Sequence, residues 1–115
     1  MTTFARIAFP LGLLLIAACA SSEAPAKQLA ESEAAVRAAK EVGADRDPQG
    51  ALYLKMARDR MEKAEALSRD GEDEQAKRLL EQAEADAELA VALAREREAE
   101  GGASQAAQQL ESLQQ

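Results

Sequence analysis

The residue of this chain best placed for chemistry is its single cysteine, Cys19. The thiolate of a cysteine is both a nucleophile and a metal ligand. Because the chain has no second cysteine, Cys19 cannot form a disulfide within it. Cys19 directly follows Ile16, Ala17 and Ala18, at the end of the only long apolar run. Its position therefore decides how the N-terminus is interpreted.

Three glutamates, Glu81, Glu84 and Glu88, form a second candidate site. Their spacing places the three carboxylates on one face of a helix. No basic residue lies between Arg78 and Arg95, so the face could bind a cation weakly or contact a basic partner. Calcium needs six or more oxygen ligands, often from a loop, and a straight helix cannot wrap around an ion. We therefore favour a solvated acidic face and expect no metal site.

Catalytic groups are scarce in this sequence. It contains no histidine, which removes the commonest general base and the common histidine metal sites. None of its serines lies in a Gly-x-Ser-x-Gly turn, and Gly101-Gly102 lacks the lysine of a phosphate-binding loop. A carboxylate pair could hydrolyse a glycoside, but that needs a cleft. We expect no enzyme and no cofactor.

Residues 1–18 have the three parts of a secretory signal: one positive charge, an apolar segment over residues 7–16, and small residues before Cys19. The apolar segment is shorter than the roughly 20 residues that span a bilayer. With Cys19 the pattern resembles the lipobox of bacterial lipoproteins, with Ile16 in place of the usual leucine. The resemblance implies a diacylglyceryl thioether on Cys19, cleavage before it, and acylation of the new amine.

The resemblance also implies a location. An acylated Cys19 would bind membrane lipid stably, because two or more acyl chains anchor a protein where one does so only marginally. The next residues are Ala20 and Ser21, whereas inner-membrane retention in the enterobacterial pattern prefers aspartate there. We therefore expect the outer membrane, with the protein facing the periplasm. The alternative is an ordinary signal peptide followed by a chance cysteine.

Composition limits the rest of the chain. The whole chain has 115 residues, which allow one small domain, and its 14 basic and 21 acidic residues give a net charge of −7. Such a chain repels phosphate backbones, so we expect no nucleic-acid partner. Alanine dominates after Cys19, and it favours helix while burying little apolar area. Tyr53 is the only aromatic residue of that part; it could bind a sugar or a partner, but we favour packing at a helix end.

Apolar residues recur at helical spacing and never alternate with period two, so we expect helices and no strand. The first helix is predicted over residues 25–42. The second, over residues 48–70, follows Asp47 as N-cap. The third, over residues 73–100, follows a tight break at Gly71, which can adopt a positive φ.

Because that break is short, the third helix must run back along the second. Both helices carry apolar seams at heptad spacing. The seams are Leu54, Ala57, Met61 and Ala64 on the second helix and Ala76, Leu80, Ala83, Ala87, Ala90 and Ala94 on the third, with Leu79, Leu89 and Leu93 widening the latter. The sequence thus predicts an all-α fold: an alanine-rich antiparallel hairpin plus an N-terminal helix, arranged as a three-helix bundle or extended and coiled-coil-like. The alanine seam could instead contact a second copy, so a homo-oligomer stays open.

Two glycine positions complete the expected organisation. Gly50, near the start of the second helix, should cost about 1 kcal/mol relative to alanine. Gly101-Gly102 should end the third helix, leaving Ala106, Leu110 and Leu113 in a weak fourth helix. The expected parts are a signal peptide (1–18), a lipidated tether (19–27), a helical domain (28–100) and a Gln-rich tail (101–115).

Three features of the helical part stand out together: the run ALYLKMA over residues 51–57, Gly71 at the turn, and the run ADAELA over residues 85–90. With these features the helical part resembles a family of small bacterial lipoproteins that carry a domain of unknown function, DUF4398. Many members carry an aromatic residue just after this glycine, where the present chain has Glu72-Asp73-Glu74. The family has no assigned activity, so the resemblance implies a fold class and a location but no reaction.

Two functions follow as expectations. The first is an outer-membrane lipoprotein that serves as a periplasmic helical interaction or envelope-structural module, with an envelope protein as partner. The alternative is a tether bound non-covalently to peptidoglycan. Covalent attachment to the cell wall through a terminal lysine is not expected, because the sequence reads Leu113-Gln114-Gln115.

Overall fold

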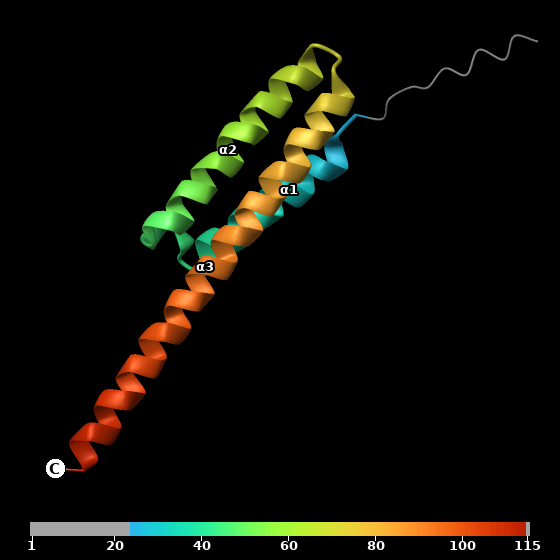
Figure 1. The fold of residues 1–115 in the computed structure, drawn as a ribbon. Helices are drawn as coiled ribbons and strands as arrows, with labels where there is room; N and C mark the ends of the chain where they lie inside the picture. Colours follow the sequence, from blue (N-terminus) through green and yellow to red (C-terminus); the bar gives the residue numbers. More distant parts are fainter. Residues whose placement is uncertain (1–23, 115) are drawn as a thin grey trace, which may run out of the picture.

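The computed structural model describes residues 24–114, which form three α-helices and one short 3₁₀ helix (Figure 1). The elements are α1 (Ala26–Glu41), η1 (Ala44–Arg46), α2 (Pro48–Arg69) and α3 (Asp73–Leu113). Residues 24–114 contain no strand. The expected all-α class is confirmed, and the three helices pack together as a bundle, which is the first of the two arrangements expected.

The junctions between the helices follow the local signals in the sequence. Gly43, just after α1, has φ +75°, and Gly71, between α2 and α3, has φ +80°. Both lie in the left-handed region that glycine adopts without steric cost. The carboxylate of Asp47 accepts a hydrogen bond of 2.8 Å from the backbone N–H of Gly50, with Pro48 at the first helical position. Asp47 is therefore the N-cap of α2, as predicted.

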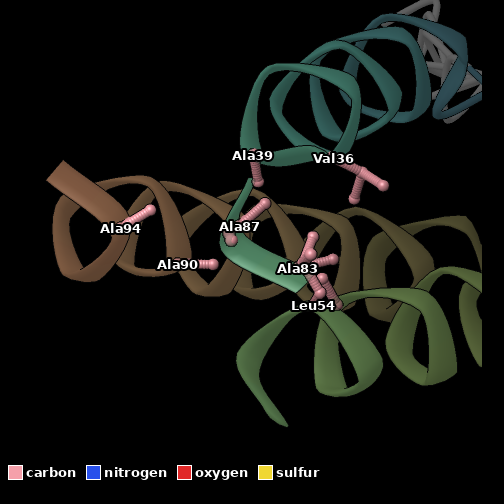
Figure 2. Packing of buried hydrophobic residues seen from close by; sticks show 9 residues of the cluster. Val36, Ala39, Leu54, Ala83, Ala87, Ala90 and Ala94 are labelled. Atoms are coloured by element: carbon pink, nitrogen blue, oxygen red, sulfur yellow. The ribbon is translucent and has the colours of Figure 1, made fainter. Parts of the chain in front are cut away.

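The core is a close contact between alanine-rich helix faces (Figure 2). All six predicted seam residues of α3 are buried, as are Leu54, Ala57 and Ala64 of α2, while Met61 is half-buried. Leu89 is 41% exposed and does not widen the stripe, whereas Leu79 and Leu93 are half-buried. A seam of alanines brings backbones close together but buries little area per residue. The core is thin, as the composition indicates.

Helix α1 lies against α3 and runs in the same direction (Figure 1). Its Val36 and Ala39 point into the core that α2 and α3 share (Figure 2). The buried Ser32 hydroxyl lies 2.9 Å from the backbone carbonyl oxygen of Leu80 and 2.7 Å from that of Gln28. The hydroxyl has one hydrogen and lies within reach of both carbonyl oxygens, and its buried contact with Leu80 ties α1 to α3 at one register.

Gly50 has a structural role that its helix propensity does not show. A Cβ placed on Gly50 would lie 2.4 Å from the backbone oxygen of Ala44 and 3.1 Å from its carbonyl carbon. Both glycine and the neighbouring Ala44 of η1 are buried. The absent side chain therefore lets η1 lie directly against the first turn of α2. The interpretation of Gly50 as a simple cost was wrong.

Helix α3 does not end at Gly101-Gly102, contrary to the prediction. It continues without a break to Leu113, so the expected fourth helix is the last part of α3 (Figure 1). Among the described residues the positive-φ glycines are Gly43 and Gly71, so both later glycines keep helical geometry. Each costs about 1 kcal/mol relative to alanine, but good helix formers flank the pair on both sides.

Two ion pairs connect α3 to the rest of the bundle. Arg60 of α2 pairs with Asp86 of α3 at a largely buried position. Arg97 of α3 lies 2.8 Å from the carboxylate of Asp47, whose side chain is only 6% exposed. Asp47 therefore caps the start of α2 and also binds α3 at the point where that helix leaves the bundle.

Candidate functional site

The predicted lipidation site lies outside the described residues, because Ile16, Ala17, Ala18 and Cys19 all precede residue 24. The structure does describe the end of the predicted tether. Pro25 is buried and α1 starts at Ala26, so the last two residues of the predicted tether are already helical. Within residues 24–114, no helix has both the length and the apolar character that a bilayer crossing requires.

The three predicted glutamates lie on one exposed side of α3, in the part of the helix that runs beside α1. Glu84 is half-buried, and Glu81 and Glu88 are exposed. Among the described residues, no group of three or more acidic or cysteine side chains is arranged to hold a metal ion.

Glu84 and Glu88 line an open groove of about 580 Å³ between α1 and α3, and Glu81 does not. The floor of the groove is apolar and made of small side chains: Ala34, Ala35 and Ala38 from α1, and Val91 and Ala92 from α3. Glu31 of α1 and Arg95 of α3 complete the lining of the groove. The groove therefore combines a flat apolar bottom with an acidic rim.

The negative charge of the rim is only partly neutralised. Glu31 lies 3.6 Å from Lys27, one helical turn earlier. Within residues 24–114, Glu84 and Glu88 have no ion-pair partner. A cationic side chain laid along the groove would meet two unpaired carboxylates beside an apolar surface. Such charge complementarity favours a basic partner and disfavours an acidic one.

The sequence predicted the acidic residues on the α3 side of this groove but not the residues on the α1 side. The spacing of Glu84 and Glu88 shows a shared face on one helix. It cannot show that Glu31 lines the same groove, because Glu31 is far from Glu84 and Glu88 in the chain. The available signal was a second small-residue face on the first helix, where Ala34 and Ala38 are one turn apart and both exposed.

Tyr53, the other residue singled out, is half-buried and packs against the core shared by the three helices. This position agrees with the interpretation of Tyr53 as a packing residue near the start of α2. It is not among the residues that line the groove between α1 and α3.

Comparison with known proteins assigns most of the chain to one sequence family model. The model is described as a domain of unknown function, DUF4398, and it matches residues 27–109. The match covers nearly all of α1, the whole of α2, and α3 to within a few residues of its end. Neither the curated proteins nor the solved structures include a match to this chain.

Proposed function

The chain belongs to the DUF4398 family, and on this premise we propose that it is an outer-membrane lipoprotein whose helical domain serves in the periplasm as an interaction or envelope-structural module. One observation carries the proposal. Cys19 directly follows Ile16-Ala17-Ala18 at the end of a signal-like apolar segment, and it is the only cysteine in the chain. A cysteine in that position is the attachment point that a lipid anchor requires.

A lipid anchor would hold the chain at the membrane surface. Each buried acyl methylene stabilises membrane binding by about 0.8 kcal/mol, so two or three chains suffice. The net charge of −7 opposes binding to anionic lipid head groups. Since α1 starts at Ala26, the segment from Cys19 spans at most about 25 Å when extended. The bundle would stay close to the membrane surface.

The form of the helical domain suits contact with another macromolecule. At 1.5 Å per residue, α3 is about 60 Å long, and the roughly 24 Å that follow Arg97 extend beyond α1 and α2 (Figure 1). The groove between α1 and α3 is open and carries no nucleophile paired with a base. These features support a binding module over a catalyst.

Membrane fractionation of a Cys19→Ala variant tests the proposal. The wild-type chain should sediment with the outer membrane. The variant should appear either as an uncleaved precursor in the inner membrane or as a soluble periplasmic protein. The matched control is Ser21→Ala, two residues further on, which should fractionate like the wild type. A Cys19→Ala variant that is cleaved and still bound to the outer membrane would contradict the proposal.

A further inference from the structure

We propose that the groove between α1 and α3 and the free C-terminal part of α3 form one continuous docking face for a basic amphipathic helix of another protein. The docking face consists of the groove residues and of α3 positions Glu88, Ala92, Arg95, Ala99, Gly102, Ala106, Leu110 and Leu113. The inference rests on the proposed function only for its periplasmic setting, because the contact itself does not need the lipid anchor.

The geometry of α3 shows that the groove and the free part share one side of the helix. The eight α3 positions of the docking face follow one another at intervals of three or four residues. At 100° per residue they lie within an arc of about 80°. The centre of this arc is about 120° around the helix from the buried alanine seam. A partner that fills the groove can therefore continue along α3 in a straight line to Leu113.

Beyond Arg97, which pairs with Asp47, the free part of α3 presents exposed side chains in the described residues. Every residue from Arg95 to Gln114 is exposed, and Leu110 and Leu113 are 61% and 83% exposed. Isolated helices of this length are marginal in water, and tertiary packing of an apolar face is what usually stabilises them. The two leucines lie on the docking face, at the end furthest from the groove. They provide apolar anchors for a helix that packs alongside.

Charge indicates which helix fits. The groove presents Glu31, Glu84 and Glu88 against one cation, Arg95. A second copy of this chain would bring a net charge of −7, and its free α3 part also holds more glutamate than arginine. Like charges at such a face oppose association, whereas lysine or arginine along the flanks of a partner helix would pair with the unpaired Glu84 and Glu88. We therefore assign the face to a basic helix and not to self-association.

Shape adds two further requirements for the partner. The groove floor is made almost entirely of alanine, so the partner needs small residues there to approach closely, as α2 does against α3. Opposite Leu110 and Leu113 it needs larger apolar residues. The distance along α3 from Glu84 to Leu113 is about 44 Å, which corresponds to a partner helix of about 30 residues.

Binding of a synthetic peptide tests the inference. The probe is a fluorescent 30-residue helix with alanine and leucine in its apolar seam and lysine on both flanks. The full chain is held in phosphatidylcholine nanodiscs, with empty discs as the blank, and anisotropy reports binding. Glu84→Gln with Glu88→Gln should weaken binding about thirtyfold, if each of the two charge pairs contributes at the upper end of the range for exposed pairs. Leu110→Ser with Leu113→Ser should also weaken it.

The matched control is Glu62→Gln with Glu65→Gln, which removes the same charge from two exposed residues of α2 that do not line the groove. This control should leave the affinity within about twofold, and the helical circular dichroism of all variants should match the wild type. Equal loss in both double variants would show non-specific attraction and overturn the inference. So would equal binding of a peptide with glutamate on its flanks. A dimer of the chain in neutral detergent that Leu110→Ser and Leu113→Ser dissociate would assign the face to a second copy instead. None of these results bears on lipidation of Cys19.

Discussion

The stability of a Gly50→Ala variant tests the structure, because helix propensity alone predicts a stabilising effect and the structure predicts a destabilising one. In a solvent-exposed helix interior, glycine to alanine stabilises by roughly 0.5–1 kcal/mol. At Gly50 the new Cβ would lie 2.4 Å from the oxygen of Ala44, and this oxygen belongs to the backbone. It cannot rotate away as a flexible side chain would. Either η1 or the first turn of α2 must move.

The expected magnitude follows from these opposing terms. Overpacking of a well-packed site typically costs about 1–3 kcal/mol, and the gain in propensity offsets up to about 1 kcal/mol of this. Movement of η1 would also strain the 2.8 Å hydrogen bond from Gly50 N–H to Asp47. We therefore expect Gly50→Ala to lower the free energy of unfolding by about 1–2 kcal/mol.

Urea unfolding followed by circular dichroism at 222 nm measures this change, with the linear extrapolation applied to both proteins. Gly101→Ala is the matched control, because this glycine is also helical and a Cβ there would meet nothing within 4 Å. The control should leave stability unchanged or raise it by at most about 1 kcal/mol. If Gly50→Ala stabilises the protein as much as the control does, the close approach of η1 to α2 is wrong.

Two further predictions concern the polar contacts of α3. Asp47→Ala should lower the free energy of unfolding by about 1–2 kcal/mol, because it removes the N-cap of α2. Arg97→Ala should lower it by less than about 1 kcal/mol, because that side chain is 67% exposed. Equal losses for the two variants in urea unfolding would contradict the N-cap role of Asp47. Arg60→Met and Asp86→Leu should each lower the free energy of unfolding by about 1–3 kcal/mol, and the double variant should lower it by less than the sum of the two. Simple additivity in this double-mutant cycle would show that the two side chains do not interact.

The helices and the hairpin could be predicted from the sequence because their signals are local. The seam from Ala76 to Ala94 repeats at heptad spacing, and every member of it is buried. Gly43 and Gly71 mark the two breaks, and each adopts the positive φ that suits glycine. Asp47 followed by Pro48 marks the start of α2 within one residue. In each case the deciding interactions lie within a few residues of one another.

Features that depend on contacts between distant residues could not be predicted in this way. The role of Gly50 depends on how Ala44 folds back over the first turn of α2. The presence of Glu31 and Glu84 in one groove depends on the register between α1 and α3, which the hydrogen bond from Ser32 to Leu80 helps to set. Periodicity on a single helix carries no information on either contact.

A pair of glycines proved an unreliable signal for the end of α3. Two consecutive glycines usually indicate the end of a helix, since each weakens it by about 1 kcal/mol. Alanine, glutamate and glutamine flank Gly101-Gly102, and they favour helix on both sides. The pair therefore weakens α3 without ending it, and this places Leu110 and Leu113 on the same straight helix as the groove.

Mass spectrometry of the N-terminal peptide, from protein purified from bacterial membranes, tests the central claim most directly. The proposal predicts a mature chain that begins at Cys19 and carries a diacylglyceryl group on the thiol and an acyl chain on the amine. A mature chain that begins at Cys19 with a free, unmodified thiol would contradict it, as would a chain cleaved at another position.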